Sequence, residues 1–437
     1  MTPVVNQQFL AALENAVNSN MLAMARRMLA DVGIAGQKRS RLFELAAIVE
    51  LKSGQPDPAE AYLIKGVACK DASAFCHYLL GSVRLSKQDF AGAVDSLTTA
   101  VKKGANFLEC RFNLAMALIQ SGQGEAALPH LDSVLEAAPR HVQAWSTKAS
   151  ALKQLGRTEA AEKAYLQALV LNPHFTEAQL GLAYIYQTAG RLDTALQLFQ
   201  AALPQIQDAR QREHVQYLVS ALSSSTAPER APDHYVRDLF DDYAKKFDRD
   251  LVERLKYQVP QMIEARIEER FPRRWAHALD LGCGTGLWGK LARPHCDRLT
   301  GLDISQGMID QAEKLSIYDE LVCAEILAHL SHQGGVYDLI VAADVFVYVG
   351  RLDDIFAAAR KALVPGGVFA FSVELTDDPV AAGYKLQASG RYAHVGTAVQ
   401  GLAAQHDLQF IEHVEGVGRE ERGVPVRTGI YLFQVRA

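Results

Sequence analysis

The sequence has few of the features that mark membrane proteins, disulfide-linked proteins or nucleic-acid-binding proteins. Its six cysteines stand singly, with no Cys-x-x-Cys pair, so neither a disulfide framework nor a zinc site is expected. No apolar run reaches the roughly 18 residues needed to span a bilayer. The first residues also lack a basic segment followed by an apolar one. We therefore expect a cytoplasmic protein with reduced thiols and no membrane partner.

The chain also has no large excess of charge of either sign. The net charge of the 437 residues is only −5, so no overall field would recruit nucleic acid. Through Leu222 there are 21 basic and 19 acidic residues, and beyond it 24 basic and 31 acidic ones. The acidic surplus of the second half argues further against binding to a phosphate backbone there. The length allows two or three domains.

A spacing of 34 residues organises the first half of the chain. Small residues recur at this spacing in two series: Gly81, Ala115, Ala149 and Ala183, then Ala93, Ala127, Ala161 and Ala195. Small side chains let antiparallel helices approach closely, and large residues four positions after the second series would fill the groove beside them. This pattern resembles the tetratricopeptide repeat family, with about six units over residues 6 to about 208.

A repeat array has no chemistry of its own, but its stacked units leave an extended concave surface. The array could recruit a protein or a carrier-bound substrate, form a homodimer, or serve only as a scaffold. Residues 211–222 show helical periodicity and would cap the last repeat, whereas residues 223–232 are rich in serine and proline. We predict a repeat array with its capping helix over residues 1–222, a linker over 223–232 and a second domain over 233–437.

The second domain alternates apolar, β-rich segments with helical patterns. The expected strands are residues 276–281, 298–303, 320–323, 337–343, 368–373, 409–413 and 429–435. Helical stretches separate the first five, which predicts a parallel sheet with right-handed crossovers. No helix separates the last two, which predicts a terminal antiparallel hairpin. The expected fold is an all-α repeat solenoid followed by an α/β, Rossmann-like domain.

Three alternating glycines, Gly282, Gly284 and Gly286, follow the first expected strand. Without a Cβ, such a turn can take positive φ values and approach a ligand closely, which predicts a nucleotide-type cofactor. Residues 284–289 also match the Gly-x-Gly-x-x-Gly dinucleotide fingerprint, so an NAD-dependent oxidoreductase is one alternative. Against it, Asp280 precedes the turn, where it would repel a pyrophosphate but suit a ligand with an amino group.

The segment Asp-Leu-Gly-Cys-Gly-Thr-Gly over residues 280–286 resembles the first motif of class I S-adenosylmethionine-dependent methyltransferases. Residues 299–308, 337–344 and 364–367 are similar to three further motifs of that family, and the resemblance covers nearly all of residues 233–437. The order of the two halves resembles bacterial predicted methyltransferases that carry tetratricopeptide repeats.

The resemblance implies S-adenosylmethionine as cofactor and S-adenosylhomocysteine as product. It places Asp280 near the methionine ammonium and makes Asp303 the acceptor of hydrogen bonds from both ribose hydroxyls. Ile304 and Met308 would flank the adenine, and Glu325 stands where the family usually carries an aspartate. The expected cofactor-binding residues are Asp280, Gly282, Cys283, Gly284, Gly286, Asp303, Ile304, Met308, Glu325, Ile326 and Ala343.

A sulfonium methyl group is already activated, so the protein mainly has to align a nucleophile and exclude water. A general base is needed only where the acceptor must lose a proton, and the candidates are Asp344, Tyr348 and His394. Asp344 could instead be a turn or cap residue, and His394 an ordinary exposed loop histidine. No cluster with metal-ligand spacing is seen in the sequence, so no metal is expected.

The expected substrate-binding residues are Phe240, Tyr243, Phe247, Arg391 and Tyr392. The first three fall on one helix face, where they would pack on the sheet or form a lid. Arg391 could hold an anionic group or be solvated. Three further arginines near the terminal hairpin are expected to be solvated: Arg419, Arg422 and Arg427.

The predicted function is S-adenosylmethionine-dependent methyl transfer to an unidentified acceptor, with the repeat array recruiting a partner or substrate or dimerising. Three alternatives remain open. They are methylation of a small molecule with the array as a mere scaffold, a non-catalytic repeat adaptor that keeps the cofactor fold, and an NAD-dependent oxidoreductase. The glycine turn with Asp280 and Asp303 speaks against the adaptor.

Overall fold

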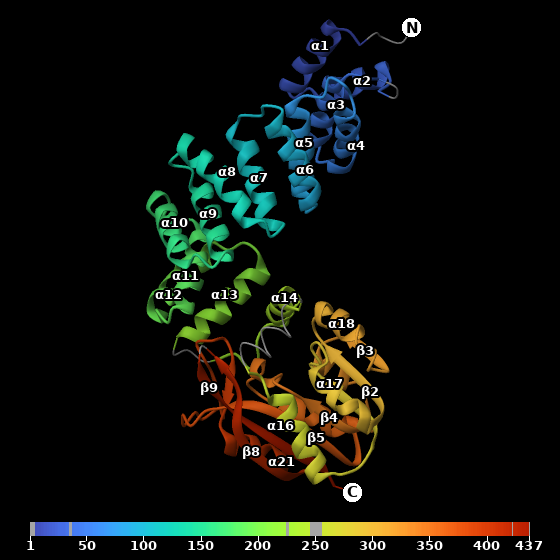
Figure 1. Ribbon diagram of the computed structural model, residues 1–437, viewed down its shortest axis with the longest axis vertical. Helices are drawn as coiled ribbons and strands as arrows, with labels where there is room; N and C mark the ends of the chain where they lie inside the picture. The colour runs from blue at the N-terminus through green and yellow to red at the C-terminus, as the bar shows by residue number, and fades with distance from the viewer. Residues whose placement is uncertain (1–4, 35–36, 224–226, 245–255, 422, 437) are drawn as a thin grey trace. The chain divides into compact units, whose positions relative to one another are not determined.

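The computed structural model describes residues 5–34, 37–223, 227–244, 256–421 and 423–436, apart from the side chains of 242 and 243. The chain divides into two compact units, Met1–Ala189 and Gly190–Ala437. Figure 1 shows the first unit from blue to green and the second from green to red. The division falls at Gly190, so the helices α12 (Leu192–Ala202) and α13 (Ala209–Leu222) group with the sheet.

The part of the first unit that the structure describes consists of eleven helices. Their bounds are α1 Gln7–Asn18, α2 Leu22–Val32, α3 Ser40–Lys52, α4 Pro56–Val67, α5 Ala74–Ser86, α6 Phe90–Lys102, α7 Leu108–Gln120, α8 Gly124–Ala137, α9 Val142–Gln154, α10 Thr158–Leu171 and α11 Thr176–Thr188.

The residues of the 34-residue spacing lie where these helices pack. Ala115, Ala149 and Ala183 are fully buried, as are the alanines of the second series. Their small side chains suit closely packed helices. Gly122 and Gly156 have φ values of 74° and 73° in the turns between paired helices, a region that favours glycine. The predicted helical repeat array is therefore confirmed.

Gly181 of α11 is a sharp test of this packing, because a Cβ there would lie 2.2 Å from Cζ of Tyr165 in α10. The Tyr165 hydroxyl shares a hydrogen bond with Ser150 (2.9 Å), which holds the ring in place. We expect Gly181→Ala to lower the free energy of unfolding by about 1–3 kcal/mol relative to Gly124→Ala. Gly124, at the first position of α8, has its nearest neighbour at 3.6 Å, so a Cβ fits there without a collision. Urea denaturation followed by circular dichroism measures the difference, and equal midpoints would contradict the packing.

The second unit continues with helices and nine strands among its described residues. Besides α12 and α13, its helices are η1 Leu203–Gln205, α14 Asp233–Tyr243, α16 Val259–Arg270, α17 Leu287–Ala292, η3 Arg293–His295, α18 Gln306–Glu313, α19 Ile326–Leu330, η4 Phe346–Tyr348, α20 Asp353–Ala362 and α21 Gly396–Gln405. Its strands are β1 Trp275–Leu281, β2 Cys296–Asp303, β3 Glu320–Cys323, β4 Tyr337–Ala342, β5 Leu363–Leu375, β6 Tyr384–Leu386, β7 Tyr392–His394, β8 Leu408–Glu421 and β9 Val424–Val435.

The strands form one sheet in the order β3-β2-β1-β4-β5-β7-β6, with β9 paired to β5 and β8 paired to β9. The first five strands pair in parallel, and β8 and β9 form an antiparallel hairpin whose second strand runs antiparallel to β5. Both features confirm the predicted topology. The strands β6 and β7 were not expected, because three residues are too few to show a period of two.

Helices cover both faces of the sheet, and alternation along each strand separates two cores. Leu279 of β1 and Ile340 of β4 face a cluster that includes α20 and α21. Their neighbours Ala278 and Leu339 face a second cluster with α16 and α17. Figure 1 shows α16 lying along this second face. Burial on both faces explains why the central strands are continuous apolar runs. Within the described ranges, every helix is too short or too polar to cross a bilayer.

Candidate functional site

A cavity of about 370 Å³ opens at the carboxyl ends of the parallel strands. The chain builds β1, β2 and β3 in one direction and then β4 and β5 in the other, so the topological switch lies between β1 and β4. Ligands of open α/β sheets bind in the crevice at such a point. Residues that directly follow β1, β2 and β4 line the cavity, among them Gly282, Ile304 and Ala343.

The cavity brings together most of the residues expected from the sequence. The expected residues that line it are Gly282, Gly284, Asp303, Ile304, Met308, Glu325, Ile326, Ala343, Asp344, Tyr348, Phe240 and Arg391. Five others lie nearby without lining it: Asp280, Cys283, Gly286, Tyr392 and His394. The Tyr243 side chain and all of Phe247 fall outside the described residues. The roles given to these residues stay predictions.

The turn after β1 has the predicted conformation. Gly282, Gly284 and Gly286 have φ values of 65°, 53° and 89°. A Cβ at Gly282 would lie 2.5 Å from Cγ2 of Val345, so any side chain there would strain the backbone and collide with the segment after β4. Glycine at this position therefore lets the turn pack closely against Val345.

Asp303, the last residue of β2, ties this turn to the next loop. Its carboxylate accepts hydrogen bonds from the Gly284 and Ser305 amides, both at 2.9 Å. Burial raises the pKa of Asp303 to about 6, because desolvation outweighs these backbone hydrogen bonds. Each carboxylate oxygen can accept more than one hydrogen bond, so the group has free capacity toward the cavity that it lines.

Asp280 lies below the turn rather than in the cavity wall. It is 1% exposed and accepts a hydrogen bond of 2.7 Å from the Tyr318 hydroxyl. Burial raises its pKa to about 7. Tyr318, which sequence reasoning missed, also explains Gly289, because a Cβ at Gly289 would lie 2.2 Å from the Tyr318 hydroxyl oxygen. Nothing in the spacing of the sequence points to Tyr318.

The helix α14 covers the cavity from the opposite side to the sheet. Its Asp241 accepts hydrogen bonds from the Ser305 hydroxyl (2.5 Å) and the Gly307 amide (2.9 Å), which holds α14 on the start of α18. The Phe240 ring meets the Tyr348 ring edge-on at 5.6 Å. Both rings line the cavity, so Phe240 and Tyr348 together form an apolar wall.

The segment expected as a linker is also part of this wall. Its described residues 227–232 run beside η4, where the Ala231 amide donates to the Tyr348 carbonyl at 2.9 Å. The Gly350 amide in turn donates to the Glu229 carbonyl at 2.7 Å. Arg230 lines the cavity and pairs with Glu325 at 3.2 Å. The connection from α13 therefore shapes the cavity directly.

The three candidate bases have different surroundings. Asp344, with a φ of 62°, donates its amide to the Ser372 hydroxyl at 2.8 Å and lies at the carboxyl end of β4. Tyr348 lies in η4 and faces the cavity. His394 is 2% exposed rather than in an exposed loop, and its Nε2 lies 3.0 Å from the Gly350 carbonyl oxygen. Burial lowers the pKa of His394 to about 4, so the ring is neutral at pH 7.

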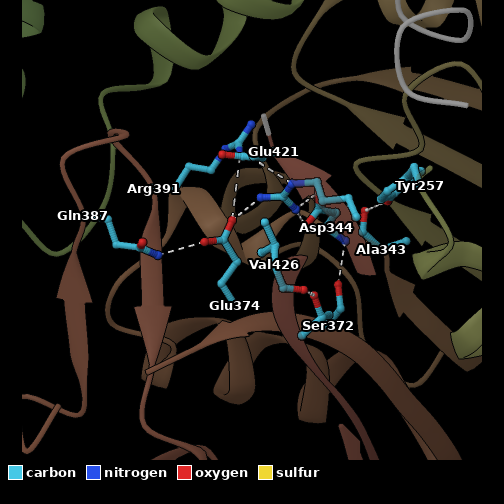
Figure 2. Close-up of polar contacts among 11 residues, drawn as sticks. Tyr257, Ala343, Asp344, Ser372, Glu374, Gln387, Arg391, Glu421 and Val426 are labelled. Carbon is cyan, nitrogen blue, oxygen red and sulfur yellow. Dashed lines mark hydrogen bonds and ion pairs between the residues drawn. The ribbon is translucent and has the colours of Figure 1, made fainter. Parts of the chain in front are cut away.

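Arg419 corrects an expectation, because it is buried rather than solvated. Its side chain is 2% exposed, and it donates two hydrogen bonds to the Asp344 carboxylate at 2.6 and 2.7 Å. It also pairs with Glu374 of β5. Figure 2 shows the contacts that converge on Asp344 and Glu374. The hairpin turns Arg419 inward, which its polar neighbours in sequence do not reveal. Arg427 is exposed as expected, and Arg422 lies outside the described residues.

Three potential metal ligands lie together on another side of the second unit. Glu264, Glu268 and His295 offer ligand atoms within 4.8 Å of one another. Each already has a protein partner, since Glu264 accepts from the Trp288 indole at 2.8 Å and His295 lies 3.2 Å from Glu268. Glu268 and His295 are also largely exposed, so this group by itself indicates no ion.

Comparison with known families agrees with both halves of the chain. A family model described as a methyltransferase domain matches residues 279–369, which include the end of β1, the glycine turn and Asp303. Two models described as tetratricopeptide repeats match residues 84–151 and 146–210.

The chain is also similar to curated methyltransferases over part of its length. It is 37% identical over 105 residues to malonyl-[acyl-carrier protein] O-methyltransferase of Geobacter sulfurreducens, covering 22% of this chain and 38% of that protein. It is 30% identical over 146 residues to trans-aconitate 2-methyltransferase of Paracidovorax citrulli, covering 30% of this chain and 55% of that protein. The matches thus span less than two thirds of these relatives.

Solved structures of other proteins resemble parts of the chain. The N-methyltransferase NodS of Bradyrhizobium japonicum in complex with S-adenosylhomocysteine covers 41% of this chain and 98% of its own, with 20% identity and a TM-score of 0.32. MamA of Desulfovibrio magneticus covers 40% of this chain and 100% of its own, with 21% identity and a TM-score of 0.36. From the family models and the curated relatives, the chain combines tetratricopeptide repeats with a methyltransferase domain.

Proposed function

We propose that the chain is an S-adenosylmethionine-dependent methyltransferase whose cofactor binds in the cavity at the carboxyl ends of β1 and β2. One observation carries this proposal. The methyltransferase match covers the glycine turn and Asp303, and these residues line one cavity at the topological switch of the sheet.

The residues present suit this cofactor. Asp303 retains hydrogen-bond acceptor capacity for two ribose hydroxyls, and Ile304 and Met308 offer apolar surface beside it for the adenine. Gly282 lets the backbone of the turn pass close to Val345, where a Cβ would collide, and its own atoms line the cavity. Asp280 is buried under the turn, so it would act on the ammonium through its charge and through the shape of the turn. When bound, S-adenosylmethionine supplies a methyl group that needs no further activation.

At the end of the cavity where the methyl acceptor would bind, the chain's own residues are arranged to align the acceptor and to exclude water. Arg419 donates two hydrogen bonds to Asp344 and fixes its position, so both carboxylate oxygens of Asp344 are already engaged. Phe240 and Tyr348 close the cavity with apolar surface. We therefore propose that the catalytic contribution is mainly orientation in a dry pocket. Tyr348 remains the candidate base for an acceptor that must lose a proton.

We propose that the repeat array recruits a protein or a carrier-bound acceptor, with homodimerisation as the second possibility. Two observations support recruitment. Stacked repeats present an extended surface for partners. A relative of the methyltransferase domain is named for a malonyl group on an acyl carrier protein, which is an acceptor that a carrier delivers. An array that only scaffolds the domain is the alternative.

Titration of the full chain with S-adenosylmethionine at about pH 6.5 tests the cofactor assignment. Burial raises the pKa of Asp303 to about 6, so this carboxyl is partly protonated before binding. Hydroxyl donors and a cationic ligand favour the ionised form, so binding should lower the pKa and release about a quarter of a proton per chain, which is the fraction of a carboxyl of pKa about 6 that is protonated at this pH. Affinity should rise as the pH rises through 6 and level off above about 7.5.

Calorimetry in two buffers of different ionisation enthalpy measures the released proton. Binding with no buffer dependence at this pH would show that Asp303 does not meet the ligand. Absence of any heat or displacement with either S-adenosylmethionine or S-adenosylhomocysteine would overturn the cofactor assignment itself.

A further inference from the structure

Two guanidinium groups meet on one carboxylate at the acceptor end of the cavity. Arg391 and Arg419 both line the cavity. Arg419 donates its Nε–H to Oε1 of Glu421 at 3.1 Å, and Arg391 pairs with the same oxygen. Figure 2 shows Arg391 and Glu421 beside each other above Glu374. The shared oxygen marks a position that a carboxylate fits.

The carboxylates around these arginines differ in how firmly they are held. Asp344 is fixed by two hydrogen bonds from Arg419, and Glu374 is buried in β5 with further hydrogen bonding from Gln387 at 2.8 Å. Glu421 is the last residue of β8 at the tip of the hairpin, and its side chain is 37% exposed. Its ion pairs in the described structure are with the two arginines alone. Glu421 is therefore the carboxylate that can leave at least cost.

The backbone holds Arg391 in place whether or not Glu421 is present. Arg391 follows a tight turn between β6 and β7, in which Gly390 has a φ of 78°. The Gln387 amide donates to the Arg391 carbonyl at 2.8 Å. The Tyr217 hydroxyl of α13 donates to the Gly390 carbonyl at 2.8 Å. A guanidinium on such a fixed segment loses little freedom when it binds a ligand.

We infer that Arg391 and Arg419 form a subsite for a carboxylate of the methyl acceptor, and that Glu421 occupies this subsite until the acceptor replaces it. The inference rests on the proposed methyltransferase function and names its substrate class, a carboxylic acid. The exchange leaves the local charge unchanged, with two guanidinium groups and three carboxylates. Binding without the exchange would add a fourth carboxylate and change the net charge of these groups from −1 to −2. Planar guanidinium groups match carboxylate geometry better than that of neutral amides.

Acetate tests the subsite without knowledge of the whole acceptor. In full-length Glu421→Ala the subsite is vacated, so acetate should fill it and raise the melting temperature. Acetate affinity should be at least about tenfold higher than in the unaltered chain, where Glu421 competes. Glu421→Gln removes the charge but keeps the side-chain volume, and its acetate affinity is compared with that of the unaltered chain in the same way. The titrations are made at constant ionic strength with chloride, and in parallel with acetamide and with phosphate.

The matched control is Glu420→Ala, because Glu420 is the neighbouring residue and pairs with Lys256 outside the subsite. It should bind acetate no better than the unaltered chain does. Adding Arg391→Gln to Glu421→Ala should abolish the gain, and acetamide should bind to none of the variants. Equal acetate responses with and without Glu421, or a gain that survives Arg391→Gln, would overturn the subsite. Phosphate binding as tight as acetate would overturn the assignment to carboxylates.

Calorimetry with S-adenosylhomocysteine on the same preparations separates the two proposals. Loss of acetate binding with intact S-adenosylhomocysteine binding would overturn the subsite alone. Acetate binding without any S-adenosylhomocysteine binding would overturn the methyltransferase proposal and leave the carboxylate site supported.

Discussion

Replacing Arg419 with methionine should lower the free energy of unfolding by about 3–5 kcal/mol. The guanidinium is 2% exposed and pairs with Asp344 and Glu374, whose side chains are 19% and 8% exposed. Removing it leaves the Asp344 carboxylate without its counter-charge and leaves Glu374 with only the Arg391 guanidinium, 3.9 Å away. Guanidinium chloride denaturation at pH 7.5 measures the loss.

Arg427→Met is the matched control, since Arg427 lies on the same hairpin and pairs with Asp377 and Glu415. Its side chain is 47% exposed, so solvent screens its ion pairs and they contribute little to stability. A loss for Arg419→Met that is no larger than that for Arg427→Met would show that Arg419 is solvated after all.

Replacing Asp303 with asparagine should weaken S-adenosylmethionine binding by roughly 10- to 100-fold, which corresponds to about 1.5–3 kcal/mol. The substitution keeps the size of the side chain but exchanges a charged acceptor for an amide that both donates and accepts. One of the two ribose hydroxyls would then lose its acceptor. Isothermal titration calorimetry at pH 7.5 measures the change in affinity.

Asparagine has a single acceptor oxygen, so either the Gly284 or the Ser305 amide also loses its acceptor in the ligand-free chain. This should lower the free energy of unfolding by about 1–3 kcal/mol, and denaturation without ligand measures it separately from the affinity. The control is Asp297→Asn in the same strand, an exposed residue near the amino end of β2 that pairs with Arg274. Equal affinities for the two variants would refute the contact between Asp303 and the ribose.

Patterns that repeat within a short window made much of the fold predictable. The spacing of 34 residues predicted the repeat array, and apolar runs separated by helical patterns predicted the parallel strands. The absence of a helix between the last two strands predicted the hairpin of β8 and β9, which β9 joins to β5. In each case the deciding interactions are local, or they repeat often enough to show in the sequence.

The expected cofactor end of the site followed for a similar reason. Parallel strands end at one edge of the sheet, so residues directly after β1 and β2 must lie close together. The sequence alone therefore predicts that the turn and Asp303 lie close together. The structure then joins them through the hydrogen bond from the Gly284 amide to Asp303.

The acceptor end depends on contacts between distant parts of the chain, which no local pattern reveals. Arg419 meets Asp344 across 75 residues of sequence, and Tyr217 reaches Gly390 across 173. Tyr318 lies 38 residues after the Asp280 carboxylate that it contacts. The residues next to a buried arginine in the sequence can be as polar as those next to a solvated one. The polar sequence neighbours of Arg419 therefore suggested, wrongly, that it is exposed. Only the path of the hairpin determines whether Arg419 is buried or exposed.

Calorimetric titration of the full chain with S-adenosylmethionine and, separately, with NAD tests the cofactor assignment most directly. Both ligands suit a glycine turn followed by an acidic residue at the end of the second strand. We expect S-adenosylmethionine to bind with one site per chain, S-adenosylhomocysteine to compete with it, and NAD to give no heat. Binding of NAD with no heat from S-adenosylmethionine would contradict the assignment and make the domain a dinucleotide-binding one.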